Sequence, residues 1–426
     1  MKTYDVAIIG SGVTGSALLY TLSKYSDVKN IALIEKYSEL ASVQSAKNNN
    51  SQTLHFGDIE TNYTVDKAKK VKEAAEMVKV YVENHEGLHK KFQKMVLAVG
   101  ENEIKRLEQR YEDFKELFPK LKKVRNEELK VLEPKVVEGR KEDLLALYTE
   151  DGYAIDYGAL AQSFVQESDD VDIFLNTPVT KIEKEDVFII KSNDKEIKAK
   201  VVVVAASASS LTFAHKMGYG KDLIILPVAG DFFCAPKLLN GKVYMMQKPK
   251  LPFAAVHGDP DVGNPNETRF GPIASVWPIL EKRNWKSFFA FLKLFRFKLS
   301  AIASIVKILS DPIYYRFVAW NVVYGVPFIG KYAFLTEVRK IVPTIKGSDL
   351  TYGRHLGGIR PQVVDTKTKK VNMGEAKILG DKIIFNITPS PGASVCLKNA
   401  EVDALHVTKF LGVDFDQEQF DKDFKR

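Results

Sequence analysis

The hexapeptide Gly10–Gly15, with the sequence GSGVTG, has the spacing of a phosphate-binding turn. Gly10 would allow a tight turn, Gly12 would let the backbone approach a pyrophosphate, and Gly15 would let a following helix pack closely against the preceding strand. A second apolar run ends in Glu35, at the distance where a carboxylate can bind a ribose 2′-hydroxyl. The pattern predicts a dinucleotide site and leaves NAD and FAD open. An ordinary glycine loop is the alternative.

An arginine and two histidines have the side chains needed to bind a carboxylate and to accept a proton. The planar guanidinium of Arg360 can bind a carboxylate through two parallel hydrogen bonds. Imidazole titrates near neutral pH, so His55 and His355 are candidate bases. His355 lies five residues before Arg360, and both could open into one pocket. A structural ion pair for the arginine and ordinary polar contacts for the histidines are the competing interpretations.

The elements around the hexapeptide predict a parallel sheet. Residues 4–9 and 31–34 are short apolar runs, and residues 16–22 between them have helical character. Residues 201–204 are four consecutive valines, apolar on both faces as in a buried central parallel strand, and we expect this strand beside the hexapeptide. Segment 37–63 is polar and too long for a simple turn, which is typical of functional loops.

The remaining chain divides into a helical part and a mixed part. Residues 65–132 are rich in Lys, Glu, Ala and Leu, with apolar residues near helical spacing, and predict helices. Residues 211–362 combine short strand-like pieces with a helical patch at 285–309. A final strand at 382–387 leads through a turn containing Pro and Gly into a helix at 394–411.

The composition is that of a globular protein. The 426 residues are 45% hydrophobic and 27% charged, which is enough chain for two connected domains. The two cysteines, Cys234 and Cys396, cannot form a disulfide framework and lack metal-ligand spacing, so we expect no metal site and a reducing, cytoplasmic setting. Because the glycine motif begins so early, we also expect no signal peptide.

The positive charge is concentrated between residues 281 and 346. This segment has twelve Lys and Arg residues against three acidic ones, whereas the whole chain has a formal net charge of +8. The rest of the chain is therefore close to neutral. A local basic segment calls for a local anionic partner, and nucleic-acid binding by the whole protein is not expected.

Four segments together resemble a known group of flavoenzymes. They are the hexapeptide, the stretch 50–63 (NSQTLHFGDIETNY), the stretch 358–362 (GIRPQ) and the turn 390–394 (SPGAS). This set looks like the FAD-dependent 2-hydroxy-acid and amino-acid oxidoreductases. The second and third segments are most similar to the malate:quinone oxidoreductase family. The resemblance runs through the chain in order and is weaker from 211 to 346.

The resemblance implies an α/β fold, in which a Rossmann-like FAD-binding domain of the glutathione-reductase type carries a mixed-sheet α+β substrate domain. It also implies FAD as cofactor, oxidation of (S)-malate to oxaloacetate, transfer of electrons to membrane quinone, and peripheral attachment to the inner, cytoplasmic face of the cell membrane. The expected division is an FAD-binding domain at 1–63, 134–210 and 350–426, a helical insertion at 64–133, and a substrate and membrane-facing domain at 211–349.

The resemblance also assigns roles to individual residues. Arg360 would anchor one malate carboxylate, and Gln52 or Arg354 would bind the other. His55 or His355 would take the hydroxyl proton. The turn before the last helix would direct its first N–H groups at the flavin N1/C2=O edge, where they would stabilise the anionic reduced flavin. The expected cofactor-binding residues are Gly10, Gly12, Val13, Thr14, Gly15, Glu35, Lys36, Ser42, Asn50, Ser51, Val179, Ala205, Ser390, Pro391, Gly392, Ala393 and Ser394.

Residues Trp285 to Leu309 predict an amphipathic helix suited to an anionic lipid surface. Basic and small polar residues fall on one side, and aromatic and aliphatic residues on the other. Charges in its middle, including Lys298, argue against a spanning helix, and a helix packed on the core is the alternative. The polar side comprises Lys286, Lys293, Arg296, Ser300, Ser304 and Lys307, and the apolar side comprises Phe289, Leu292, Phe295, Leu299, Ile302 and Val306.

Two rival functions fit the same sequence. A sibling enzyme would oxidise 2-hydroxyglutarate or an amino acid with the same flavin chemistry. A flavin-binding protein of another class would have lost catalysis and would serve an assembly or membrane-scaffolding role. Bleaching of the flavin absorption by malate, and not by the substrates of the sibling enzymes, would select malate oxidation over both rivals.

Overall fold

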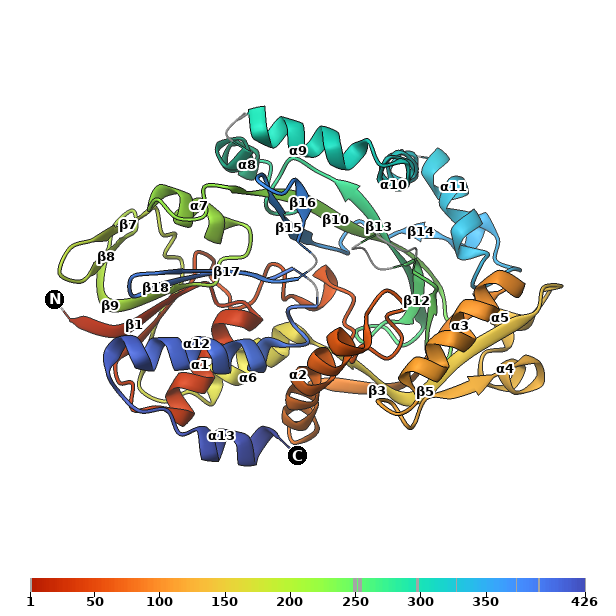
Figure 1. Ribbon diagram of the computed structural model, residues 1–426, viewed down its shortest axis with the longest axis horizontal. Coiled ribbons are helices and arrows are strands. Elements are labelled where there is room, and N and C mark those ends of the chain that lie inside the picture. The colour runs from red at the N-terminus through yellow and green to blue at the C-terminus, as the bar shows by residue number, and fades with distance from the viewer. Residues whose placement is uncertain are drawn as a thin grey trace.

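The protein is built on two β-sheets that lie side by side, with helices packed around them (Figure 1). The computed structural model describes residues 2–247, 251, 255–295, 299–326, 328–372, 374–389 and 391–425. Three residues to which the sequence assigns roles, Ser390, Arg296 and Lys298, lie outside these ranges.

The first sheet is built around the strand that precedes the hexapeptide. Its eight strands are β1 (Thr3–Ile9), β2 (Ile31–Ile34), β6 (Val171–Phe174), β7 (Lys181–Lys184), β8 (Phe188–Lys191), β9 (Glu196–Val204), β17 (Ala376–Gly380) and β18 (Ile383–Ile387). β1 pairs in parallel with β2 and with the valine strand β9. β6 and β18 continue the parallel pairing, while β7, β8 and β17 are antiparallel additions. The predicted parallel sheet is confirmed.

Helices cover both faces of this sheet and leave the valine run fully buried. Val201 and Val203 enter the core beneath helices α1 (Val13–Tyr25) and α12 (Cys396–Leu411), whereas Val202 and Val204 enter the opposite core. Successive residues of a strand point to opposite faces, so an uninterrupted apolar run is needed where both faces are covered. The other helices are α2 (Val65–Glu83), α3 (Glu101–Phe114), α4 (Asn126–Leu132), α5 (Pro134–Val137), α6 (Tyr157–Gln166), α7 (Ser209–Lys216), α8 (Ser287–Phe295), α9 (Leu299–Leu309), α10 (Pro312–Tyr324), α11 (Ile329–Val338) and α13 (Gln417–Phe424).

The second sheet is larger and mostly antiparallel. Its ten strands are β3 (His89–Val99), β4 (Lys122–Val124), β5 (Leu144–Ile155), β10 (Leu223–Pro236), β11 (Lys242–Met245), β12 (His257–Pro260), β13 (Glu267–Val276), β14 (Thr351–Tyr352), β15 (Ile359–Asp365) and β16 (Lys370–Val371). Only the pairing of β3 with β11 is parallel among the described strands of this sheet. Helices α8 to α11 run along its outer side, as the upper part of Figure 1 shows.

The structure differs from the sequence predictions in three respects. Segment 64–133, expected to be helical throughout, contributes β3 and β4, because the lysine-rich first half of β3 hides its strand pattern. The second sheet also takes β5 from segment 134–210 and β14 to β16 from segment 350–426. Residues 285–309 form two separate helices, α8 and α9, where one was expected.

Gly15 is the residue that lets α1 approach the turn before it. A Cβ atom at this position would lie 2.0 Å from the carbonyl oxygen of Gly10, which is backbone and cannot swing away. We predict that Gly15→Ala lowers the free energy of unfolding by at least about 2 kcal/mol, the upper part of the range for overpacking. Urea denaturation measures this. Gly374→Ala is the control, because a Cβ atom there meets no atom within 4 Å, and an equal loss in both variants would contradict the explanation.

Candidate active site

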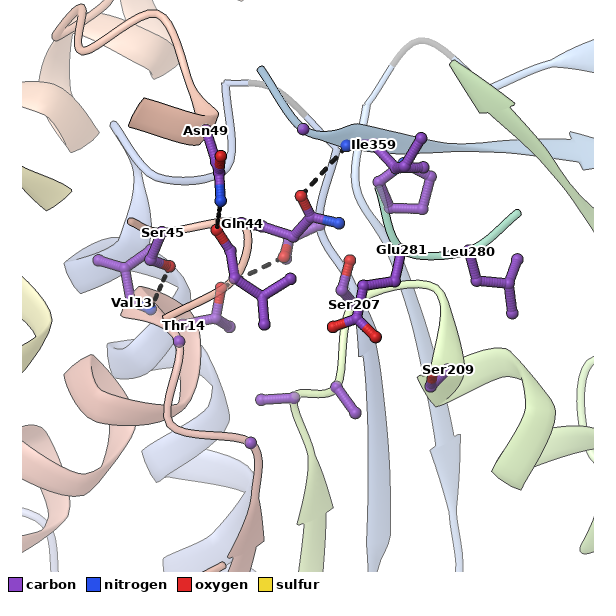
Figure 2. Close-up of a pocket in the computed structure, with 18 of the residues that line it drawn as sticks. Val13, Thr14, Gln44, Ser45, Asn49, Ser207, Ser209, Leu280, Glu281 and Ile359 are labelled. Carbon is purple, nitrogen blue, oxygen red and sulfur yellow. Dashed lines mark hydrogen bonds between the residues drawn. The ribbon is translucent and has the colours of Figure 1, made fainter. Parts of the chain in front are cut away.

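A cavity of about 680 Å³ connects the two sheets (Figure 2). It begins at the carboxyl ends of β1, β2 and β9, where Gly10, Glu35 and Ala205 line it, and reaches Phe232 on β10 and Arg360 on β15. The carboxyl ends of parallel strands are the usual place for ligands in open α/β sheets, and the volume lies in the range of small-molecule sites, about 300–1,000 Å³. The cavity is therefore the candidate site.

The hexapeptide presents the N-terminus of α1 to this cavity. The Val13 amide donates to Ser45 Oγ at 2.9 Å, and a Cβ atom on Gly12 would lie 3.2 Å from the same oxygen. Glycine at position 12 thus keeps the space in front of the helix open, where the positive end of the helix dipole favours a phosphate. In Figure 2, Val13 and Ser45 lie on one side of the cavity, with Leu280 and Glu281 on the other.

Glu35 is held rigidly at the end of β2. Its carboxylate accepts hydrogen bonds from Ser11 N at 3.0 Å and Ser11 Oγ at 2.8 Å, and its second oxygen accepts from Tyr37 N at 3.1 Å. These bonds orient the carboxylate at the cavity wall, with lone pairs left for a ligand hydroxyl. The placement is that of a ribose-binding acid in a dinucleotide fold.

The segment before α8, residues 280–287, closes the cavity on the opposite side. Glu281 pairs with Lys36 across 2.8 Å, and both residues line the cavity. Burial lowers the pKa of Lys36, but the charge and hydrogen bond of Glu281, together with Tyr37, outweigh this and raise the pKa above its ordinary value. Arg283 donates to Asn49 Oδ1 at 3.1 Å, and Lys282 pairs with Asp231 on β10. This segment, which we call the strap, therefore ties α8 to three parts of the wall.

At the far end, the loop that carries His55 is joined to the turn before α12. Ser394 Oγ accepts from His55 N at 3.0 Å and donates to Thr53 O at 3.3 Å, while Tyr157 Oη donates to Thr53 O at 2.9 Å. The side chain of His55 lines the cavity, and its Nδ1 lies 2.5 Å from Glu60 Oε1. Since Nδ1 is engaged, Nε2 is the nitrogen left for proton transfer.

Arg360 contributes a guanidinium with no anionic partner. It is half-buried on β15 and lines the cavity, and no carboxylate or hydrogen-bond acceptor for its side chain occurs among the residues that the structure describes. Burial lowers the pKa of Arg360 from its ordinary value, and the nearby hydroxyls of Tyr244 and Tyr63 act in the opposite direction. An arginine stays charged in proteins, so this end of the cavity suits a ligand carboxylate.

The structure places most predicted site residues around this cavity. Gly15 lies behind the wall, against Gly10, and Ser390 is outside the described residues. The predicted residues that line the cavity are Gly10, Gly12, Val13, Thr14, Glu35, Lys36, Ser42, Asn50, Ser51, His55, Val179, Ala205, Arg360, Pro391, Gly392, Ala393 and Ser394.

Three predicted residues lie elsewhere. Arg354 and His355 are exposed and do not line the cavity, because the chain turns at Gly357 before β15 begins. Gln52 is fully buried. Its Nε2 donates to Lys47 O at 3.0 Å, and its Oε1 accepts from Val262 N at 3.1 Å. His55 and Arg360 are thus the two chemically active candidates that the fold brings to one cavity.

Glu60 is the residue of this site that the sequence reasoning missed. It lies within the family-like stretch 50–63, five residues after His55. A loop has no periodicity that would predict which side chains return to one another. The acid itself was the only signal in the sequence, because a carboxylate close to a candidate base is a common way to orient it.

Comparison with known proteins now decides the family. Residues 5–368 match the family model described as FAD dependent oxidoreductase. The chain is 43% identical over 443 residues to the probable malate:quinone oxidoreductase of Campylobacter jejuni, with 98% of each chain covered. It is also 43% identical to a malate:quinone oxidoreductase of Helicobacter pylori, covering 99% of this chain and 97% of that one.

The chain belongs to the malate:quinone oxidoreductase family. Among solved structures it is similar to an L-alpha-glycerophosphate oxidase from Mycoplasma pneumoniae with FAD bound, with a TM-score of 0.68, 19% identity, and coverage of 97% of this chain and 96% of that one. This likeness confirms the predicted fold class, and FAD is the cofactor of the family.

The cavity fits FAD, the cofactor of the malate:quinone oxidoreductase family. Its length runs from Glu35, at a ribose-binding position, past the N-terminus of α1 to Ser394 and His55. The open cradle at Gly12 would take the pyrophosphate, since a Cβ atom there would crowd Ser45. The turn 391–394 and His55 would then flank the flavin ring.

The ion pair between Glu281 and Lys36 generates a prediction about cofactor retention. We expect Glu281→Gln to speed the release of FAD, because the strap loses its charged contact with the wall beside Glu35. Recovery of flavin fluorescence after dilution of the holoenzyme measures the rate. The matched control is Glu337→Gln on α11, which breaks a more exposed ion pair with Lys340. Equal release rates in the two variants and the wild type would contradict a retaining role for the strap.

Proposed function

We propose that this protein oxidises (S)-malate to oxaloacetate with FAD and passes the electrons to a membrane quinone. The family supports the reaction class, and the guanidinium of Arg360 in the cavity, which has no anionic partner among the described residues, is the observation that carries the substrate assignment. A half-buried guanidinium that lines a cavity offers its donors to a ligand anion, and a carboxylate matches their geometry. Malate brings such an anion.

Arg360 would bind the C1 carboxylate of malate through its planar fork. This contact would hold C2 of malate, the carbon that carries the hydroxyl, beside the flavin ring and would bring the hydroxyl toward His55. His55 would accept the hydroxyl proton on Nε2, because Nδ1 is engaged by Glu60. FAD, when bound, would accept the hydride from the same carbon. Oxaloacetate is then released, and the proton stays on the imidazole until it exchanges with solvent.

The substrate assignment is tested by Arg360→Gln. We predict that malate affinity falls by about 10- to 100-fold, which corresponds to the roughly 1.5–3 kcal/mol of a hydrogen bond to a charged group. Titration of flavin bleaching by malate under anaerobic conditions measures the affinity. Arg360→Lys restores the charge without the planar fork and should recover only part of the loss. Unchanged affinity in Arg360→Gln would show that another residue holds the carboxylate.

The same titration separates the rival functions. Bleaching by malate, but not by 2-hydroxyglutarate, glycine or D-alanine, is the expected result. Bleaching by one of the other substrates would favour a sibling enzyme. Absence of bleaching by all of them would favour a non-catalytic flavoprotein.

Peripheral attachment to an anionic lipid surface on the cytoplasmic face is the second part of the proposal. Leu299 is 84% exposed on α9, and Phe289 and Val306 are more than half exposed, with Lys293 and Lys307 exposed beside them. A helix packed on the core would bury its apolar side chains, so these exposures favour the lipid interpretation. Ser304, expected on the polar side, is buried instead.

The exposed apolar surface continues beyond the predicted segment. α10 and α11 add further aromatic and aliphatic side chains, of which Phe328 between them is 90% exposed. None of the helices in the described part of the chain is long and apolar enough to cross a bilayer. The added exposed side chains are Ile313, Tyr315, Trp320, Val322, Val326, Phe328, Ile329 and Tyr332.

The lipid surface is tested by the triple variant Phe289→Ser, Val306→Ser and Lys293→Gln. We predict that it no longer sediments with anionic vesicles, because it loses apolar insertion and one basic contact worth about 1 kcal/mol. Val131→Ser with Leu405→Ser is the control, since both residues are exposed apolar side chains outside helices α8 to α11. Unchanged co-sedimentation of the triple variant would rule this surface out.

A further inference from the structure

We propose that Glu60 is the positioning residue of His55: it fixes the imidazole with Nε2 toward the cavity and stabilises the imidazolium that forms during oxidation. The inference rests on the proposed function, in which His55 takes the hydroxyl proton of the substrate. It adds a residue that acts through the base and does not touch the substrate.

The geometry of the pair sets the tautomer of the imidazole. Glu60 Oε1 lies 2.5 Å from His55 Nδ1, and the two side chains are only 8% and 12% exposed. The second oxygen, Oε2, is buried and has no hydrogen-bond partner among the described residues, so the directed hydrogen bonding of this carboxylate goes to His55. A carboxylate that accepts from Nδ1–H leaves the lone pair on Nε2, which is the form a base needs.

The backbone on both sides of Glu60 is clamped. Arg110 on α3 donates to Gly57 O at 3.1 Å and to Tyr63 O at 3.3 Å, and its guanidinium lies 3.7 Å from the ring centroid of Phe114. The backbone of His55 is fixed by Ser394. Because the two partners are held by different parts of the fold, their contact does not depend on the flexibility of the loop between them.

The charges around the pair keep Glu60 ionised. Burial alone would raise the pKa of Glu60, but its hydrogen bond to His55, the charge of the imidazolium when His55 is protonated, and the charge of Lys94 hold it below its ordinary value. Lys94 in turn pairs with Asp58 at 2.9 Å, so Lys94 is already neutralised and does not replace His55 as the partner of Glu60. The other titratable groups near enough to feel the charge of Glu60 are Lys67 on α2, Arg110 on α3, Tyr244 on β11 and Tyr63 on the same loop, and Arg360 on β15 lies near Tyr63 and Tyr244.

The role of Glu60 follows from the proton balance. The malate hydroxyl proton would move to His55 Nε2, the C2–H bond would break with its hydride passing to the bound FAD, and the C–O bond would become a carbonyl. The imidazole then carries a positive charge, which the nearby carboxylate stabilises while remaining ionised itself. Without this carboxylate the ring would lose both its orientation and its electrostatic support in the transition state.

The chain contains a matched pair for comparison. His85 Nε2 contacts Glu167, and these side chains are 29% and 35% exposed and do not line the cavity. If both carboxylate–imidazole contacts served folding alone, removing the carboxylate of Glu60 or that of Glu167 would have a similar effect on the rate of flavin reduction. Only Glu60 should alter the reaction.

The experiment compares Glu60→Gln, Glu60→Asp and Glu167→Gln as FAD-loaded proteins. Anaerobic stopped-flow reduction by malate is followed as a function of pH. We expect Glu60→Gln to slow flavin reduction by at least about 100-fold, the scale of an orienting carboxylate in a catalytic triad, with malate affinity changed by less than about threefold. The acid limb of its rate profile should move to lower pH, because imidazole is less basic without the carboxylate. Glu60→Asp should recover part of the rate, and Glu167→Gln should behave as the wild type.

The outcomes separate this inference from the proposed function. Reduction of Glu60→Gln by malate at the wild-type rate and with an unmoved acid limb would overturn the role of Glu60 and leave the function standing. If malate does not reduce the wild-type flavin, the function fails, and ¹⁵N NMR of histidine-labelled protein decides on the pair. A wild-type His55 with its proton on Nδ1 supports the pairing, and a proton on Nε2 overturns it. The NMR result on the wild type also decides if Glu60→Gln does not fold.

Discussion

One buried junction, centred on Thr53 and Ser394, holds the two sheets in register around the cavity. Ser394 joins the loop of His55 to the turn before α12. Thr53 Oγ1 contacts Tyr244 Oη at 2.7 Å and Lys242 Nζ at 3.0 Å, both on β11 of the second sheet. The loop that carries His55, the turn before α12 and β11 of the second sheet therefore meet at two hydroxyl side chains. These bonds fix the position of the loop that carries His55, because buried polar groups must keep their partners.

The second sheet buries several charged side chains. Lys94, Lys242 and Arg269 are each at most 1% exposed, and the strand register sets Lys94 opposite Lys242 and Asp259 opposite Arg269. Burial lowers the pKa of Lys242 to about 8, against the opposing charge of Asp259. The ion pairs that these charges form, Lys94 with Asp58, Lys242 with Asp259 and Arg269 with Asp261, contribute little net stability, since desolvation offsets their attraction. Their value here is specificity, because an alternative register would leave one of these charges unpaired.

The first sheet was predictable and the second was not, for a physical reason. The hexapeptide, Glu35 and the valine strand are local signals, and each imposes a conformation on its own few residues. β3 and β5 belong to the second sheet through pairings between distant segments, which no local pattern encodes. The same distinction divides the site. Sequence proximity suggested that His355 accompanies Arg360, but the turn at Gly357 separates them, whereas Glu60 returns to His55 through a loop with no regular period.

The strap relates the cavity to the exposed helices. Residues 280–287 form one wall of the cavity, and α8 begins within them, so the exposed apolar layer starts where the wall ends. Three residues of the strap, Glu281, Lys282 and Arg283, contact Lys36, Asp231 and Asn49, respectively. A reduced cofactor would therefore lie beneath the layer that we propose to meet lipid. A lipid-soluble electron acceptor does not need to leave the bilayer environment in this arrangement, whereas malate and oxaloacetate, which are dianions, require a route from water.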